Sequence, residues 1–145
     1  MPKYADVNES QKQDKLKELP ATDDCFVCGR FNPRGLGIRF FADSDGAYAQ
    51  YVPPVGFQGY DGILHGGILS TLLDEIMVKA LAARQITAVT GKLEVRFRKS
   101  APMGDKLFIK GWVVSERKMS FQAAGCIKNE AGGVLCEGKG LFFPA

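Results

Sequence analysis

The sequence predicts an α+β domain in which an antiparallel sheet of about six strands wraps around one long central helix. Two observations carry this prediction: residues 68–83 form a strongly apolar helical segment, and four long strand-like segments follow it. A helix that is apolar around most of its circumference needs a wide surface to cover it, and a sheet provides that surface. The length of 145 residues suits a single domain.

The first twenty residues are polar and charged. Residues Asp6–Leu19 predict a short N-terminal helix that ends at Pro20. We therefore expect an N-terminal arm over residues 1–20 and one domain over residues 21–145. The arm lacks the apolar core of a signal peptide, and no apolar run approaches the roughly 18 residues that span a bilayer, so we expect a cytoplasmic protein.

Two short strands are predicted after a loop over residues 21–35. They are Leu36–Ala42 and Ala47–Val52, and the turn residues Asp43–Gly46 between them indicate a hairpin. The central helix follows over Ile68–Ala83. Its apolar side chains occupy more than one stripe, so most of the helix surface is expected to be buried.

Four long strands complete the predicted sheet. They are Thr87–Lys99, Lys106–Glu116, Phe121–Asn129 and Val134–Phe143. In the first of them apolar and polar residues alternate, which indicates one buried and one solvated face. The apolar face consists of Val89, Leu93, Val95 and Phe97. The alternation places Thr90 on the polar face.

The composition and the charge exclude some classes of function. With 46% hydrophobic and 24% charged residues, the chain is neither disordered nor fibrous. A net charge of +3 is too small to indicate a nucleic-acid partner. Residues 92–118 are locally basic and residues 42–83 are acidic and apolar, which suits a ligand with a phosphate-bearing end and an apolar end. From charge alone, a solvated strand face is the stronger explanation.

The start of the central helix is the first candidate site. Gly66 and Gly67 leave backbone N–H groups unshielded where the helix dipole is positive. Such an end stabilises an oxyanion that forms on a carbonyl or thioester. The alternative is that the two glycines only allow a tight turn into the helix.

Asp74 is the second candidate site residue. Burying a carboxylate in an apolar helix costs free energy, so we expect it to have a partner or a function. We expect Asp74 to be the buried carboxylate and Glu75 its solvated neighbour, with the reverse assignment as the alternative. Gly66 and Asp74 are eight residues apart, a rise of about 12 Å, so one substrate carbonyl cannot reach both on a single helix. If both act on one substrate, two helices must meet, which implies a site shared between two subunits.

The lone histidine and the four cysteines are weaker candidates for catalysis or metal binding. His65 is better explained as a hydrogen-bonding residue of the turn than as a general base, and no second histidine exists for a triad. Cys25 and Cys28 have metal-ligand spacing, but Cys126 and Cys136 are ten residues apart. We therefore expect free thiols and no bound metal.

From Cys25 to Phe143 the sequence resembles the hotdog-fold acyl-CoA thioesterases of the phenylacetate-pathway (PaaI-like) group. The motifs that carry the resemblance are His65-Gly66-Gly67 followed by Asp74, Cys25-Phe-Val-Cys28-Gly29 with Asn32-Pro-Arg-Gly35-Leu36, Gln58-Gly-Tyr-Asp-Gly62, and Phe97-Arg-Lys-Ser-Ala-Pro102-Met-Gly104-Asp105. The resemblance implies a hotdog fold that pairs as a homodimer, and often as a homotetramer built from two dimers.

The resemblance also implies roles for individual residues. The family's carboxylate, a general base or nucleophile, falls on Asp74, its oxyanion-hole glycine on Gly66, and the histidine of its motif on His65. Some members use a threonine as a further catalytic residue, and Thr90 matches its position. Where other members have an asparagine this chain has a glycine, and the adjacent Gln58 is the candidate substitute.

The activity implied is hydrolysis of an acyl-CoA thioester to the free acid and CoA. Gly66 of one subunit would hold the carbonyl oxygen and Asp74 of the other would activate water or attack. The expected CoA contacts are Gly67, Arg96, Arg98, Lys99, Arg117 and Lys118. No cofactor, metal, nucleic acid or membrane partner is expected.

Three alternatives compete with this activity. A non-catalytic acyl-CoA binder or sensor is favoured by the missing asparagine, although the intact Asp74 counts against it. A thioesterase acting on acyl-carrier protein would use the same residues, and the basic segment does not distinguish the two substrates. A hotdog dehydratase is disfavoured, because its chemistry needs a different constellation around a histidine.

Overall fold

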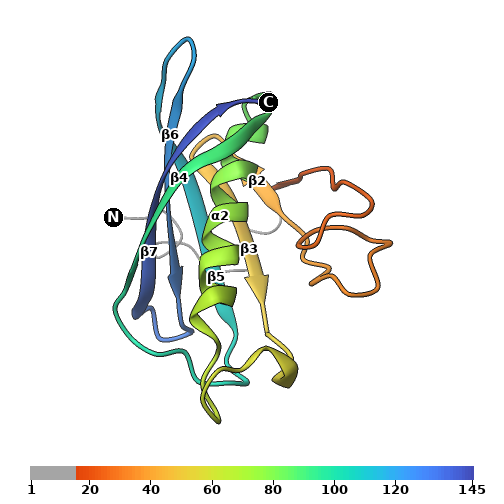
Figure 1. Ribbon diagram of the computed structural model, residues 1–145, viewed down its shortest axis with the longest axis vertical. Helices are drawn as coiled ribbons and strands as arrows, with labels where there is room; N and C mark the ends of the chain where they lie inside the picture. Colours follow the sequence, from red (N-terminus) through yellow and green to blue (C-terminus); the bar gives the residue numbers. More distant parts are fainter. Residues whose placement is uncertain (1–15) are drawn as a thin grey trace.

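The computed structural model describes residues 16–145 (Figure 1). Most of the predicted N-terminal helix, Asp6–Leu19, lies outside the described residues. Its last part is not helical: Lys17–Glu18 is a short strand, β1, that pairs antiparallel with Phe41 and Ala42. The Arg39 side chain fixes this pairing, because its guanidinium contacts the Glu18 carboxylate at 2.6 Å. The prediction of a helix was therefore wrong for these residues.

Within residues 16–145, seven antiparallel strands form one curved sheet, where about six were predicted. The bounds are β1 (Lys17–Glu18), β2 (Phe41–Asp43), β3 (Gly46–Tyr51), β4 (Ala88–Phe97), β5 (Leu107–Glu116), β6 (Phe121–Lys128) and β7 (Val134–Pro144). The order across the sheet is β1-β2-β3-β5-β6-β7-β4. Strand β4 is therefore a long edge strand that pairs only with β7.

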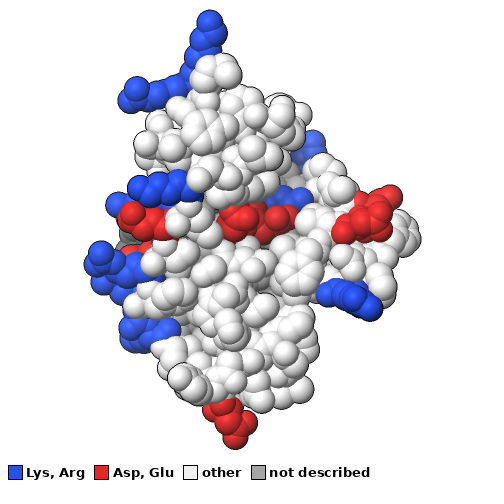
Figure 2. All heavy atoms as spheres, viewed as in Figure 1, with Lys and Arg blue, Asp and Glu red and all other residues white. Residues whose placement is uncertain are grey.

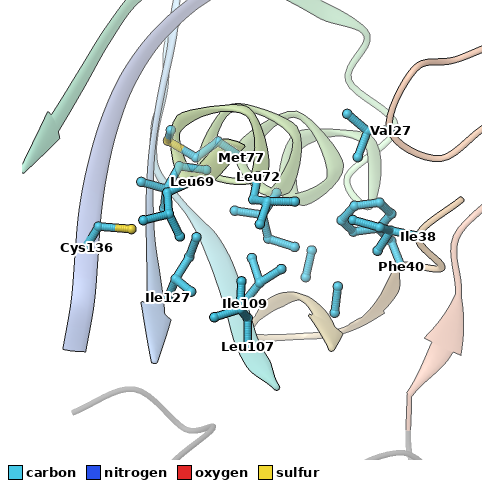
Figure 3. Close-up of a cluster of buried hydrophobic side chains, with 14 of the residues drawn as sticks. Val27, Ile38, Phe40, Leu69, Leu72, Met77, Leu107, Ile109, Ile127 and Cys136 are labelled. Carbon is cyan, nitrogen blue, oxygen red and sulfur yellow. The ribbon is translucent and has the colours of Figure 1, made fainter. Parts of the chain in front are cut away.

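Helix α2 (Gly66–Ala82) lies along the concave face of this sheet, as Figure 1 shows, and a short 3-10 helix, η2 (Val55–Phe57), precedes it. The helix begins two residues before the predicted start, at the glycine pair. Its buried side chains form the centre of the core with residues from the sheet (Figure 3). Those on the helix are Leu69, Leu72, Leu73, Ile76, Met77, Lys79, Ala80 and Leu81.

Glycines in the sheet allow the helix to pack closely. A Cβ at Gly111 would lie 2.6 Å from the backbone oxygen of Ile76, and one at Gly138 would lie 3.3 Å from the Leu73 side chain. Real Cβ atoms do not approach a backbone oxygen that closely, so position 111 requires glycine. The high glycine content of the sequence is explained in part by this contact between helix and sheet.

Strand β4 contains a bulge that changes the predicted faces. Its register with β7 shifts between Thr90 and Lys92, so Gly91 is an extra residue. Thr90 pairs with the buried Phe142 and faces the helix, whereas Val89 is 54% exposed. The predicted alternation holds for Leu93 and Val95, which pack against the core, but it was wrong for Thr90 and Val89.

Candidate active site

The entry to helix α2 is organised by His65. Its ring nitrogen Nδ1 accepts a hydrogen bond from the Gly67 backbone N–H at 2.8 Å and so caps the helix. A Cβ at Gly67 would lie only 3.0 Å from that nitrogen, which explains the glycine. The interpretation of His65 as a residue that positions the turn agrees with this geometry.

The Gly66 amide is left available at the same helix end. Its N–H has no hydrogen-bond acceptor within residues 16–145, whereas the neighbouring His65 N–H donates to the Phe57 carbonyl at 3.0 Å. The backbone around it is held in place, since Leu64 N–H donates to the Ala101 carbonyl at 2.9 Å. The Phe97 ring covers one side of Gly66. A rigid, unpaired amide at a positive helix end can stabilise a developing oxyanion.

Asp74 lies in the middle of α2 and faces the edge strand β4. The Thr90 hydroxyl donates a hydrogen bond of 2.6 Å to its Oδ1. This short distance is typical of a hydroxyl that donates to a carboxylate. The bulge at Gly91 turns Thr90 toward the helix, so the structure brings together two residues that the sequence had placed on different surfaces.

Glu75 is the more deeply buried of the two carboxylates. Its side chain is 16% exposed and lies 3.8 Å from the Lys79 ammonium. Burial raises the pKa of Glu75 above its ordinary value, and the Lys79 charge opposes that rise. The expectation that Asp74 is the buried carboxylate and Glu75 the solvated one was therefore wrong, because the helix turns Glu75 toward the loop over residues 21–35. Asp74 is half-buried and faces the opposite flank of the helix.

Gln58 lies near this site but is used locally. Its side-chain oxygen accepts a hydrogen bond from the Gly62 N–H at 3.2 Å, which stabilises the loop before the helix. Gln58 also forms a bridge with Leu64. The Gln58 side chain thus stabilises the loop that carries Gly66. Its side-chain NH₂ group is the part that could donate a hydrogen bond to a substrate or to water.

The basic residues expected to bind CoA do not gather in one place. Arg98 and Lys99 follow the end of β4, beside the helix start, while Arg117 and Lys118 occupy the β5–β6 turn at the opposite end of the sheet. Arg98 is also paired with Glu137 at 3.0 Å. Figure 2 shows Lys and Arg side chains at the upper end of the molecule and an acidic patch at mid-height over α2, on a face that is otherwise mostly uncharged.

The cysteines fall into two groups. Cys126 and Cys136 are buried on β6 and β7, where burial raises the pKa of both thiols, that of Cys136 to about 12. Cys25 and Cys28 lie in the loop over residues 21–35 and contact Glu75. A four-cysteine site, considered from the sequence, is not formed. The contact with Glu75 was missed, because nothing in the spacing of the sequence links residue 25 to residue 75.

Comparison with known proteins identifies the family. The sequence model of the thioesterase superfamily matches residues 61–136, slightly more than half of the chain. The chain therefore belongs to the thioesterase superfamily. The match includes His65, Gly66, Asp74 and Thr90. A search of the curated proteins finds no match.

Solved structures agree with this assignment. A thioesterase superfamily protein superimposes with a TM-score of 0.79 at 26% identity, covering 83% of this chain and 63% of its own. The PaaI protein of Escherichia coli has a TM-score of 0.70 at 21% identity, covering 74% and 83%. A Streptococcus pneumoniae protein described as a hypothetical thioesterase with coenzyme A has a TM-score of 0.70 at 24% identity, covering 74% and 85%. The predicted hotdog fold is confirmed. No helix within the described residues is long and apolar enough to cross a membrane.

Proposed function

We propose that the protein hydrolyses acyl-CoA thioesters at a site shared between two copies of the chain. The observation that carries the proposal is the Asp74 carboxylate, held at 2.6 Å by the Thr90 hydroxyl on the open flank of the central helix. A carboxylate fixed by one hydrogen bond, with its second oxygen directed elsewhere, is suited to accept a proton from water. Family membership supports this chemistry.

The Gly66 amide supplies the second element of the proposed mechanism. It is rigid and has no acceptor within the described residues, so it can receive the oxyanion that forms at the thioester carbonyl. The helix rise puts it about 12 Å from Asp74 of the same chain. The amide must therefore come from one subunit and the carboxylate from the other if both act on one carbonyl.

The edge strand β4 supports the pairing of two chains. It is ten residues long, and its outer edge forms no strand pair within the described residues. Val89 and Phe97 on this strand are 54% and 52% exposed. A long edge strand with unpaired backbone groups and exposed apolar side chains is a template for pairing with another strand. Antiparallel pairing of two β4 strands would bring the helix start of one chain toward the β5–β6 turn of the other.

That arrangement also accounts for the divided basic residues. Arg98 and Lys99 of one chain would approach Arg117 and Lys118 of the other, so that phosphate groups would meet positive charge from both chains. Gly67 and Arg96 are the remaining proposed CoA contacts. The Streptococcus pneumoniae relative is described as a complex with coenzyme A, which supports CoA as the thiol portion of the substrate.

Two further matched structures bear on the proposed residues. They are variants of the Streptococcus pneumoniae protein in which one threonine or one aspartate is replaced by alanine. The two altered positions are 16 residues apart in that protein, the same separation as between Asp74 and Thr90 here. The agreement supports the choice of these two residues.

In the proposed reaction Asp74 acts as general base or as nucleophile. As a base it takes a proton from water while the water oxygen adds to the thioester carbonyl, and the oxyanion rests on the Gly66 amide. The C–S bond then breaks, the acid leaves, and the proton passes to the CoA thiolate. After a single turnover in oxygen-labelled water, label in the Asp74 side chain establishes nucleophilic attack, because it enters only when water adds to the Asp74 carbonyl of an acyl-enzyme anhydride.

The test is free-thiol release from short-chain, long-chain and aromatic acyl-CoAs by Asp74→Asn. We expect kcat to fall by roughly 10²- to 10⁴-fold, because the amide cannot accept the proton, while acyl-CoA binding is kept. Glu130→Gln is the matched control, since Glu130 is exposed in the turn between β6 and β7 and belongs to neither the proposed site nor strand β4. Full activity in Asp74→Asn would overturn the assignment of Asp74. Binding without turnover in the unmodified protein would favour the acyl-CoA sensor instead.

A further inference from the structure

The flank of helix α2 opposite Asp74 carries a cluster that the proposed hydrolysis does not use. The thiol sulfurs of Cys25 and Cys28 and a carboxylate oxygen of Glu75 all lie within 4.8 Å of one another. Cys25 Sγ is 3.8 Å from Glu75 Oε2. Two side chains come from the loop over residues 21–35 and one from the helix. The cluster therefore joins segments that are fifty residues apart in the sequence.

The loop presents Cys25 as a thiolate ligand would be presented. Its sulfur faces the backbone N–H groups of Val27 and Cys28, at 3.4 and 3.5 Å. Both N–H groups can donate to the sulfur of a metal-bound cysteine. The turn closes through Gly29, whose N–H donates to the Cys25 carbonyl at 3.0 Å. A Cβ at Gly29 would lie 2.5 Å from that oxygen, so the turn requires glycine.

Glu75 lacks the short partner that a buried carboxylate normally has. Its closest charged neighbour in the described chain, the Lys79 ammonium, is 3.8 Å away, and Cys25 Sγ is equally distant. Charge-assisted hydrogen bonds of carboxylates are about 2.7–2.9 Å long. The carboxylate is thus directed at the two sulfurs without a strong bond to either, and a cation between the three groups would satisfy it.

We infer that Cys25, Cys28 and Glu75 bind a thiophilic divalent cation, with Zn²⁺ as the best match. In a tetrahedral zinc site, bonds of about 2.3 Å to sulfur and about 2.0 Å to oxygen place a sulfur and an oxygen ligand about 3.5 Å apart. The Cys25 Sγ to Glu75 Oε2 distance of 3.8 Å is close to this separation, so a small side-chain adjustment would complete the geometry. The site differs from the four-cysteine site considered from the sequence, because Cys126 and Cys136 take no part in it.

Lys79 balances the charge of the proposed site. Two thiolates, one carboxylate and one Zn²⁺ sum to a single negative charge, and a buried site of that charge needs a nearby cation. Lys79 is 8% exposed, and its ammonium lies 3.3 Å from Cys28 Sγ and 3.2 Å from the Pro20 carbonyl. Water is the expected fourth ligand, since the three side chains leave one position of a tetrahedral site open.

The proposed metal would attach the loop to the residue next to Asp74 in the helix. A metal that joins two segments of the folded chain contributes directly to the folding free energy, because the unfolded chain does not hold its ligands together. The site would therefore act as a clamp on the loop, separate from substrate chemistry. The inference does not depend on the proposed hydrolysis.

Cobalt substitution of the full chain tests the inference. The reduced, metal-free protein is titrated with Co²⁺, and we expect a thiolate-to-cobalt charge-transfer band that saturates at about one equivalent per chain. Added Zn²⁺ should then remove the band. Cys25→Ser and Cys28→Ser should abolish it, and Glu75→Gln should weaken the affinity roughly 10-fold or more. Cys126→Ser, a buried cysteine outside the cluster, is the matched control and should keep the band.

A second measurement needs no variant. Alkylation of the unmodified protein, followed by peptide mass spectrometry, should show that Zn²⁺ protects Cys25 and Cys28 from modification. The inference is overturned if the reduced protein gives no charge-transfer band, if the band survives in both cysteine variants, or if Zn²⁺ leaves the alkylation of Cys25 unchanged. Asp74→Asn should keep the metal and lose hydrolysis, so failure of one proposal is separable from failure of the other.

Discussion

Asp74 and Glu75 are neighbours in sequence, yet they serve two different regions of the molecule. Asp74 faces the open edge strand β4 and receives one short hydrogen bond from Thr90. Glu75 faces the loop over residues 21–35 and lies among Cys25, Cys28 and Lys79 at longer distances. Figure 1 shows that α2 separates these regions, with β4 on one side and the loop on the other.

The difference shows how a helix assigns two tasks to adjacent residues. Successive side chains point about 100° apart around a helix, so one carboxylate can be accessible while the next is enclosed. The accessible carboxylate has one short hydrogen-bond partner, the Thr90 hydroxyl, which suits the proposed role of Asp74. The enclosed one has neighbours that suit ion binding or packing. Four substitutions test this division, starting with the one that should disturb both regions.

Gly111→Ala should have the largest effect. Its methyl group would lie 2.6 Å from the Ile76 carbonyl and push α2 away from the sheet, which displaces both carboxylates. We expect the free energy of unfolding to fall by about 3 kcal/mol, measured by urea denaturation. Gly56→Ala is the control, because nothing lies within 4 Å of a Cβ there. An unchanged midpoint in Gly111→Ala would contradict the close packing described.

Asp74→Glu should have the next largest effect, although it keeps the charge. The extra methylene moves the carboxylate by about 1 Å or more and removes it from the Thr90 hydroxyl. Such displacements cost roughly 10²-fold in kcat/KM. Thiol-release kinetics check the value. Activity close to that of the unmodified protein would mean that a carboxylate on this flank suffices without exact placement.

Thr90→Val should have a smaller effect on the same flank. Valine has the shape of threonine but cannot donate to Asp74 Oδ1, and a hydrogen bond to a charged group is worth about 1.5 kcal/mol or more. We expect kcat/KM to fall roughly 10-fold. Thr90→Ser retains the hydroxyl and should recover most of the activity. Equal losses in both variants would indicate that packing, and not the hydroxyl, matters at this position.

His65→Ala should have the smallest effect. It removes the acceptor that caps α2 through the Gly67 N–H, and loss of a helix cap costs about 1 kcal/mol. The thermal midpoint should fall by roughly 3 °C. His65→Asn restores a good capping side chain and should recover the stability. A midpoint that is lowered equally in both variants would argue against the capping role.

The sequence allowed the central helix and the last four strands to be predicted, and it supplied the candidate site residues, which stay predictions. Strong patterns marked them: the apolar residues of α2 and the glycine pair at its start. The strand at Lys17–Glu18 was missed, because two charged residues have no strand pattern of their own and are ordered by pairing with β2. The orientation of Thr90 was missed because one extra residue, Gly91, reverses the alternation.

The distribution of the two carboxylates also lay beyond the sequence. Adjacent side chains point about 100° apart around a helix, so the orientation of the helix about its own axis decides which of the two is enclosed. The packing of the whole helix against the sheet sets that orientation. The cluster of Cys25, Cys28 and Glu75 depends on a loop that folds back across the helix. Contacts of that kind leave no periodic pattern in the chain.

The order of the strands has a consequence for how the protein is made. Strand β4 leaves the ribosome before β5, β6 and β7, yet β7 is its only strand partner within the described residues. Until β7 is available, Thr90 has no sheet to hold it against the helix, although Asp74 is already synthesised. Contacts between such distant segments form late in folding. A nascent chain stalled before residue 134 would therefore carry the carboxylate of the site but not its assembled geometry.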